Sequence, residues 1–358
     1  MRFEISRVLD TIERCLTTDP AVARGIVEVG EVIRYVDLDN GRPASLLRLG
    51  YVIDALARQV AEEGVAVYAV VDRSVLSDGD LTSNERMVLR RWADDGLVEV
   101  LASAGDRVFE VADLTGLPVL TRRDLRGLTA RYPWLVADPG RLLTPVAGGG
   151  GAMLRAPGGV ASPVALTHPV LSRLWRCPEP GCESFGPGRT AGQPPPRMRA
   201  GVPTCARHEH PLADAGPRPP AVTLAIRVDG VVRRRFAVTA GVPVTVGRDP
   251  ADERGIRLGP WLTGDALLRV SRSHLVVSLG PSGLEVRDTS TNGTVIRGAH
   301  GDVKLERGGT HVLGETDVVE LHSGVELARA SRWRSGGVVE PRSVMSDAPT
   351  IAMRRPLS

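Results

Sequence analysis

Three short motifs between residues 247 and 294 carry side chains that could hold a phosphate-bearing ligand. Gly247-Arg248 comes first, Ser271-Arg272-Ser273-His274 second, and Asp288-Thr289-Ser290-Thr291-Asn292-Gly293-Thr294 third. Arg248 offers a planar fork for phosphate oxygens, Ser271 a hydroxyl donor, and Asn292 an amide that can hold a peptide backbone. Taken singly, Asn292-Gly293 would also fit a hairpin turn and Arg248 a surface charge. Three spaced motifs are much harder to match by chance than one.

The segments between these motifs alternate apolar and polar residues, as the strands of a half-buried antiparallel sheet do. The alternation begins near residue 222 and continues to residue 321, broken by Gly, Pro and Asn. Short strands at near-regular spacing predict a β-sandwich. Because a sandwich places its turns at its two ends, we expect the motif residues to lie on binding loops.

Residues 221–330 resemble the forkhead-associated (FHA) family on these motifs. The resemblance implies an all-β FHA sandwich that binds phosphothreonine in peptides through Arg248 and the loops around it. It also implies that Arg272 is a second basic contact and that Thr291 helps to select phosphothreonine. By the same resemblance His274 braces the binding loop, while Gly247 and Gly293 allow tight turns.

The first part of the chain alternates strand-like and helix-like segments, which is typical of an α/β domain with a parallel sheet. An amphipathic helix is expected within residues 1–30. Over residues 31–146 the pattern predicts strand 32–36, helix 46–60, strand 65–71, helix 83–95, strand 97–101, helix 106–115, strand 117–121 and helix 124–131.

Aspartates gather where these predicted strands end. Asp37 and Asp39 close the first strand, Asp72 closes the second, and Asp106 and Asp124 open the helices after the third and fourth. The carboxyl ends of parallel strands converge on a crevice. Carboxylates gathered there would favour Mg²⁺ or Mn²⁺, which can activate water for attack on a phosphodiester.

The acidic residues also have purely structural explanations. Asp106 and Asp124 are well placed as helix N-caps, and Asp37 could hold a loop. Thr82 with Glu85 forms a capping-box pattern, which explains Glu85 without any chemistry.

Residues 31–146 resemble PIN-like nucleases of the NYN type. The resemblance lies in the stretches Tyr35-Val36-Asp37-Leu38-Asp39-Asn40, Ala104-Gly105-Asp106-Arg107, Val119-Leu120-Thr121-Arg122-Arg123-Asp124-Leu125 and Arg131-Tyr132-Pro133-Trp134-Leu135. It implies a metal-dependent ribonuclease with Asp37, Asp106 and Asp124 as ligands, Asn40 in support, and Asp39, Asp72 and Glu85 as further candidates. The chain departs from the family where Arg123 stands in place of an acid, and an arginine there could pair with the carboxylates and displace the metal.

Three cysteines and a histidine between residues 172 and 213 have the spacing of a structural zinc site. Cys177 and Cys182 form one pair, and Cys205 and His208 form the other. Three thiolates and one imidazole can hold tetrahedral Zn²⁺, with His210 as an alternative fourth ligand. The segment resembles a zinc ribbon, although its Pro-rich insert is long, and a disordered linker with ordinary cysteines is the alternative. Cys15, far from the others, is most simply a packing residue.

Composition limits the remaining possibilities. The 358-residue chain is long enough for two or three domains, and its net charge of +3 creates no strong field for polyanions. No apolar run approaches the roughly 20 residues of a membrane span, and the start lacks a signal-like pattern, so we expect a cytoplasmic protein without a membrane partner. Residues 147–171 read as a Gly/Pro-rich linker, and residues 331–358 as a disordered tail in which Thr350 is a candidate phosphosite.

The sequence therefore predicts a multidomain protein with an α/β PIN-like domain, a small zinc-ribbon-like segment and a C-terminal all-β FHA sandwich. As an enzyme it would be a Mg²⁺- or Mn²⁺-dependent ribonuclease acting on RNA and directed by phosphorylation. As a binding protein it would be a non-catalytic adaptor in Ser/Thr kinase signalling. In both cases the expected partner is a phosphothreonine-containing protein, such as a Ser/Thr kinase substrate.

Overall fold

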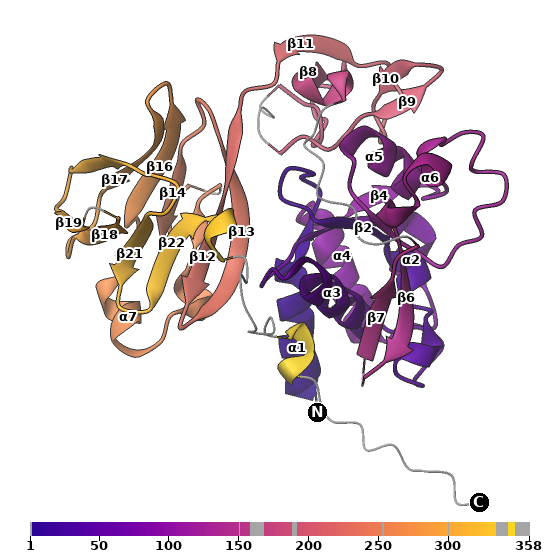
Figure 1. Ribbon diagram of the computed structural model, residues 1–358, viewed down its shortest axis with the longest axis horizontal. Coiled ribbons are helices and arrows are strands. Elements are labelled where there is room, and N and C mark those ends of the chain that lie inside the picture. The colour runs from indigo at the N-terminus through magenta and orange to yellow at the C-terminus, as the bar shows by residue number, and fades with distance from the viewer. Residues whose placement is uncertain are drawn as a thin grey trace, which may run out of the picture.

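An α/β unit, a cysteine-containing segment and a β-sandwich follow one another along the chain (Figure 1). This computed structural model describes residues 2–149, 151–157, 168–187, 192–252, 254–299, 301–333 and 343–347. Within these ranges no helix is long and apolar enough to cross a membrane. The predicted phosphosite Thr350 lies outside the described residues.

The α/β unit is built on a seven-stranded sheet in the order β1-β3-β2-β5-β6-β7, with β4 also paired to β3. All its strand pairs are parallel except β6 with β7. Apolar side chains are buried on both faces, as expected for a parallel sheet covered by helices. The helices are α1 (Arg2–Arg14), α2 (Val29–Val32), α3 (Leu47–Val60), α4 (Ser83–Asp94), α5 (Arg107–Thr115) and α6 (Trp134–Ala137), with short 3-10 turns η1 (Val36–Leu38), η2 (Arg73–Ser77) and η3 (Pro139–Arg141). The strands are β1 (Leu16–Thr17), β2 (Gly25–Glu28), β3 (Val67–Asp72), β4 (Glu99–Leu101), β5 (Val119–Leu120), β6 (Leu142–Gly148) and β7 (Gly151–Arg155).

The predicted strand 32–36 is wrong, and so is the expected domain start at residue 31. The strand between β3 and β5 is β2, and it comes earlier in the chain. Residues 29–32 are helical, because Val29, Val32 and Ile33 recur at helical spacing and are all buried. Residues 1–30 thus belong to the α/β unit.

The predicted helix 124–131 is also wrong, since residues 126–131 form turns and residues 124 and 125 have no regular structure. Gly127 adopts a left-handed φ of 84°, which interrupts the helical pattern of Leu125 and Leu128. The backbone N–H of Arg126 donates to Asp124 at 3.0 Å, which closes a local turn instead of a helix cap.

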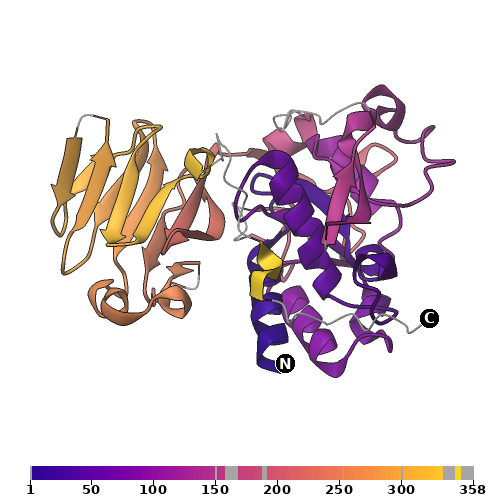
Figure 2. The same cartoon turned by 60° about the horizontal axis from the view of Figure 1, so that its bottom comes forward.

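Two segments expected to be unstructured contribute to the α/β unit. The predicted linker 147–171 begins inside the β6–β7 hairpin, whose turn lies beside Tyr51. In the predicted tail, the 3-10 turn η7 (Val344–Asp347) packs on α1 and α3 (Figure 2). Buried Asp54 accepts hydrogen bonds from Ser343 Oγ at 2.5 Å and from the backbone N–H of Val344 at 2.6 Å. The tail is therefore ordered over residues 343–347.

The cysteine-containing segment consists of two small antiparallel strand pairs. Its elements are the 3-10 turn η4 (Pro169–Ser172) and the strands β8 (Arg173–Arg176), β9 (Arg197–Arg199), β10 (Val202–Thr204) and β11 (Ala213–Pro217). The segment is anchored to α5, because the buried Arg107 donates to the carbonyls of Pro195 and Pro196.

The C-terminal unit is a two-sheet sandwich with one shared apolar core. The six-stranded sheet has the order β13-β12-β22-β21-β18-β19, and the five-stranded sheet β15-β14-β16-β17-β20. The strands are β12 (Ala221–Val228), β13 (Val231–Thr239), β14 (Val244–Gly247), β15 (Ile256–Arg257), β16 (Leu275–Gly280), β17 (Gly283–Asp288), β18 (Thr294–Gly298), β19 (Gly301–Leu305), β20 (Thr310–Val312), β21 (Val318–His322) and β22 (Val325–Arg329). Short helical turns η5 (Gly259–Trp261), α7 (Gly264–Arg269) and η6 (Ala330–Trp333) connect or follow them.

A buried charge cluster joins the sandwich to the α/β unit. Arg235 of β13 pairs with Glu62 at 3.1 Å and donates to the backbone carbonyl of Gly64 at 3.1 Å. The Arg235 side chain is 1% exposed and that of Glu62 is 0% exposed. Arg24 also pairs with Glu62, at 3.0 Å. The sandwich is thus attached through β13 and the turn after α3.

Candidate functional site

The five predicted ligand-binding residues of the sandwich line one shallow hollow. Arg248 follows β14, Ser271 and Arg272 follow α7, and Thr291 and Asn292 lie between β17 and β18. The hollow is lined by Arg248, Asp249, Ala251, Leu268, Arg269, Val270, Ser271, Arg272, Ser273, Thr289, Thr291, Asn292 and Arg307. Residues from three separate loops therefore meet at one place.

Arg248 is held in the hollow through its backbone and its side chain. Its N–H donates to the Ser271 carbonyl at 2.9 Å, and its carbonyl accepts from the N–H of Gly259 at 2.9 Å. Its guanidinium donates to the Leu267 carbonyl at 2.6 Å. Within the described part of the chain it has no carboxylate partner, so its charge is available to an anionic ligand.

Ser271 and Asn292 connect the loops that carry them. Ser271 Oγ accepts the backbone N–H of Thr291 at 3.1 Å, which leaves its own proton free to donate outwards. Asn292 Nδ2 donates to the Arg269 carbonyl at 2.8 Å, and its amide oxygen remains available. These two contacts hold the loops together. The hydroxyl proton of Ser271 and the amide oxygen of Asn292 are still available to a ligand in the hollow.

His274 lies fully buried beneath the same loops. Its Nδ1 accepts the backbone N–H of Ser271 at 3.0 Å, and its backbone carbonyl accepts from the N–H of Thr289 at 2.9 Å. Burial lowers the pKa of His274, and the nearby Asp288 opposes this effect only in part. The neutral imidazole therefore supports the loop from below.

The stability of the sandwich is expected to fall as the pH drops below about 6.5, the usual pKa of an unfolded histidine. Because the folded pKa of His274 is lowered, the unfolded chain binds the proton more tightly than the folded chain does. The contribution of neutral His274 to stability is therefore fully present above that pH and is lost as the pH falls below it. Each unit of pKa difference corresponds to about 1.4 kcal/mol. Urea unfolding of wild type and His274→Gln between pH 5 and 8 measures this slope. Identical slopes in the two proteins would rule out His274 as the source.

Two glycines are required where the loops approach one another. A Cβ on Gly247 would lie 2.1 Å from the carbonyl oxygen of Arg272. Gly293 has a left-handed φ of 81°, and a Cβ there would lie 2.8 Å from the Leu305 carbonyl oxygen. Both positions thus exclude any side chain.

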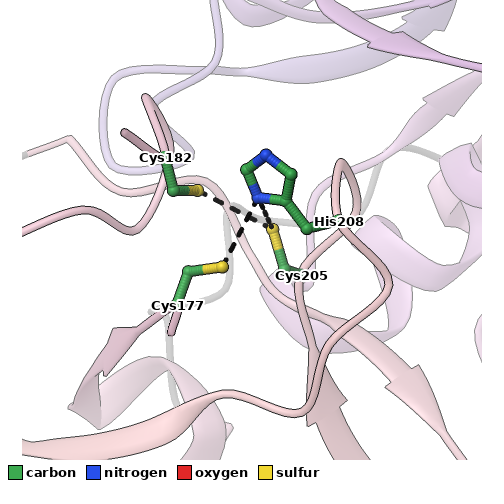
Figure 3. A group of neighbouring side chains, drawn as sticks. All are labelled: Cys177, Cys182, Cys205 and His208. Atoms are coloured by element: carbon green, nitrogen blue, oxygen red, sulfur yellow. Dashed lines mark hydrogen bonds between the residues drawn. The ribbon is translucent and has the colours of Figure 1, made fainter. Parts of the chain in front are cut away.

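The four predicted zinc ligands lie together within the cysteine-containing segment, with their side chains pointing toward one another (Figure 3). Cys177 Sγ lies 3.4 Å from His208 Nδ1, Cys205 Sγ lies 3.7 Å from the same nitrogen, and the Sγ atoms of Cys182 and Cys205 are 3.8 Å apart. All four ligand atoms lie within 4.8 Å of one another. The alternative ligand His210 is instead about half exposed and faces Glu179 at 3.4 Å.

The three individual distances of 3.4, 3.7 and 3.8 Å match the edges of a zinc-centred tetrahedron. Metal–ligand bonds of about 2.3 Å to sulfur and about 2.0 Å to nitrogen place sulfur atoms about 3.7 Å apart, and sulfur about 3.5 Å from nitrogen. Without a cation, burial raises the pKa of Cys205 to about 12. A divalent cation would supply the positive charge that buried thiolates need.

The five predicted acidic ligands of the α/β unit do not converge. Asp37 pairs with Arg122 at 2.6 Å, which lowers the pKa of its carboxyl. Among the described residues, the only group with metal-ligand spacing is the cysteine and histidine cluster. The other four acids are each held locally, Asp39 by Arg48, Asp72 by Ser74, Asp106 by Arg131 and Asp124 by Arg126.

The acid that ends the central strand β2 is Glu28, which the sequence analysis missed. Burial raises the pKa of Glu28, and the Arg123 guanidinium beside it, 3.4 Å away, opposes this effect. Arg123 also donates to the Gly105 carbonyl. Glu31, one helical turn further, accepts the N–H of Arg122 at 2.6 Å. Arg123 thus occupies the crevice at the carboxyl ends of the strands.

A family model for the FHA domain matches residues 244–322. Several solved FHA domains are similar in structure, each aligned over 30% of this chain. The MEK1 FHA domain is 23% identical over 86% of its own length with a TM-score of 0.23, and the FHA domain of human APLF, solved with an XRCC1 bisphospho peptide, is 19% identical over 97% with a TM-score of 0.23. The FHA domain of a Chlamydia trachomatis protein is 22% identical over 97% with a TM-score of 0.24. No curated protein matches the chain. On the family match, residues 244–322 of the sandwich are an FHA domain.

Proposed function

We propose that this protein binds phosphothreonine-containing partners through its FHA domain and acts as an adaptor in Ser/Thr kinase signalling. The observation that carries the proposal is the convergence of Arg248, Ser271 and Asn292 on one hollow within the FHA domain. Substrates of Ser/Thr kinases are the partners that carry this modification.

The chemistry of the hollow suits a phosphorylated peptide. A phosphothreonine carries a charge of about −1.5 to −2 near neutral pH and three acceptor oxygens. Arg248 and Arg272 supply guanidinium donors, and Ser271 Oγ supplies a hydroxyl donor. Asn292 can bind the peptide backbone on either side of the phosphorylated residue, and Thr291 lies beside it to contact the threonine.

Arg248→Ala is expected to weaken binding of a phosphothreonine peptide roughly 100-fold, since it removes charge-assisted hydrogen bonds worth about 3 kcal/mol in total. Calorimetric titration of the full-length protein measures this loss. Arg297→Ala is the matched control, because Arg297 pairs with Glu320 outside the hollow and should bind like wild type. Equal affinity of Arg248→Ala and wild type would overturn the assignment of Arg248.

The cysteine and histidine cluster is proposed to hold a structural Zn²⁺. Cys177, Cys182, Cys205 and His208 supply four ligand atoms within 4.8 Å of one another, enough for a complete tetrahedral shell that leaves no position for a catalytic water. The ion would serve as the core of a segment whose own apolar cluster is small.

The α/β unit is proposed to be a non-catalytic module with a PIN-like arrangement. What supports this view is the position of Arg123, whose guanidinium pairs with Glu28 at the strand ends. The ribonuclease is a second proposal, because Glu31 and Asp72 each lie close enough to Glu28 to add to the rise of its pKa. Mn²⁺-dependent cleavage of labelled single-stranded RNA, lost in Glu28→Gln and Asp72→Asn, would favour the enzyme. Equal activity in all three proteins would favour the adaptor.

A further inference from the structure

We propose that a cavity between α1, β13 and η7 is a binding site for a phosphate group carried by Ser346, and that phosphorylation of Ser346 thereby fixes the sandwich against the α/β unit. The inference makes no use of the FHA hollow, so it stands apart from the proposed function. The cavity has a volume of about 60 Å³ and is lined by residues from all three elements. Figure 2 shows η7 beside α1.

The wall of this cavity carries more positive than negative charge. Arg14 comes from the last turn of α1, and Arg233 and Arg234 come from β13. Among the described residues that line the cavity, Glu63 is the one carboxylate, and its Oε1 accepts the backbone N–H of Val232 at 3.2 Å. Three guanidinium groups and one carboxylate leave an excess of two positive charges. A phosphoserine carries about −1.5 to −2 near neutral pH, so its charge matches this excess.

A β-bulge in β13 explains how two consecutive arginines reach the same cavity. Successive side chains of a regular strand point to opposite faces of the sheet. Arg234 pairs with Ile226 of β12, and the next residue of β12 pairs with Val232. Arg233 is therefore an extra residue in the strand register, which interrupts the alternation. As a result, both Arg233 and Arg234 line the cavity.

Ser346 provides an accessible hydroxyl at this cavity. The residue lines the cavity and is also exposed to solvent, where a protein kinase can reach it. Its backbone N–H donates to the Ser343 carbonyl at 3.2 Å, which holds the residue in the η7 turn. In the described part of the chain its Oγ takes part in no hydrogen bond, so a phosphate added to this atom breaks none there.

Ser343, in the same turn, is not suited to the same modification. Its Oγ donates to the buried Asp54 at 2.5 Å and accepts the backbone N–H of Met345 at 3.0 Å. A phosphate on this atom would remove the donor and place negative charge beside a buried carboxylate. The charges around η7 thus favour a phosphate on Ser346 and oppose one on Ser343.

The modification is the transfer of the γ-phosphoryl group of ATP by a Ser/Thr protein kinase. The bond between Ser346 Oγ and phosphorus forms while the bond between that phosphorus and the β,γ-bridging oxygen breaks. The hydroxyl proton passes to a base of the kinase, and ADP leaves. The new phosphate oxygens can accept N–H groups from the arginines of α1 and β13, which joins η7 to both units.

The test uses the full-length protein with genetically encoded phosphoserine at position 346. Hydrogen exchange over residues 343–347 and at β13 is expected to slow at least about tenfold relative to the unmodified protein, the effect of one charge-assisted hydrogen bond. Phosphoserine encoded instead at position 103 is the control, because Ser103 is exposed and does not line the cavity. Its exchange rates should match those of the unmodified protein. Unchanged or faster exchange after modification of Ser346 would overturn the inference.

The double variant Arg14→Gln, Arg233→Gln separates binding by the arginines from a general effect of the phosphate. It is measured with and without phosphoserine at position 346, so that any destabilisation by the substitutions cancels in the comparison. The variant should lose most of the protection, whereas Arg297→Gln should keep it, since Arg297 pairs with Glu320 elsewhere. Full protection in the double variant would contradict the assigned arginines.

Mass spectrometry of the protein isolated from its own cells checks the modification itself. Phosphate is expected on Ser346 and not on Ser343. Phosphate on Ser343 alone, or on neither serine, would overturn the choice of Ser346.

Discussion

Replacing Cys205 by serine is expected to abolish zinc binding and to unfold the cysteine-containing segment. Cys205 is 0% exposed, and its Sγ contacts two other members of the cluster, at 3.8 Å from Cys182 Sγ and 3.7 Å from His208 Nδ1. Free energies of structural zinc binding are about 10–16 kcal/mol, far more than the small apolar cluster around these residues can replace. The segment should therefore lose its fold together with the ion.

The measurement is the zinc content of the purified protein together with hydrogen exchange over residues 173–217. Wild type should hold about one zinc ion per chain, as a single four-ligand site requires. Cys15→Ser is the matched control, because Cys15 is also buried but lies in the core of the α/β unit. Zinc retained at full occupancy in Cys205→Ser would contradict the proposed centre.

Glu62→Ala is expected to lower the free energy of unfolding by about 3–5 kcal/mol, because it leaves a buried guanidinium without its carboxylate. The Glu62 carboxylate forms ion pairs with two arginines, Arg235 of the sandwich at 3.1 Å and Arg24 of the α/β unit at 3.0 Å. Burial lowers the pKa of Arg235, and Glu62 opposes this effect. The loss of Glu62 should therefore also loosen the attachment between the two units.

Urea unfolding and hydrogen exchange at β13 measure this effect. Glu183→Ala is the matched control, since Glu183 pairs with Arg207 on the surface, where such a pair contributes less than about 1 kcal/mol. The double variant Glu62→Leu, Arg235→Met should be less destabilised than the sum of its single changes. A loss in Glu62→Ala no larger than that in Glu183→Ala would show that the pair does not hold the units together.

The FHA prediction succeeded because its signals are local in the sequence. The alternation of apolar and polar residues marks each strand, and the motif residues stand at the ends of those strands. The family match over residues 244–322 confirms this domain. Arg307 could not be found in this way, since it lies in a turn outside the motifs and reaches the hollow only through the backbone contacts of Asp288.

The N-terminal region was predicted correctly as mixed α/β, but its central strand was not found. Four residues, Gly25–Glu28, are too short to show a pattern, while Val32-Ile33-Arg34-Tyr35-Val36 looks β-like in isolation. Tertiary packing decides between them, because Val29, Val32 and Ile33 bury one helical face. Because the predicted strand lies too late in the sequence, the acid expected at its end is Asp37, whereas the acid that ends the observed strand is Glu28.

The contacts of residues 343–347 could not be predicted from the sequence either. Nothing near Val344 shows a periodic pattern, and the partner Asp54 lies 290 residues earlier in the chain. Gly50 permits the approach, since a Cβ there would lie 2.3 Å from the sulfur of Met345. Such a contact depends on the surface that α1 and α3 create only after folding.

The central claim, recognition of phosphothreonine by the FHA hollow, is tested most directly by titrating the full-length protein with one peptide in three forms. The forms carry threonine, phosphothreonine or phosphoserine at the same position, with glutamate flanks. We expect micromolar or tighter binding of the phosphothreonine form, about −8 kcal/mol, and at least about tenfold weaker binding of the other two. Equal affinity for the threonine and phosphothreonine forms would contradict the account.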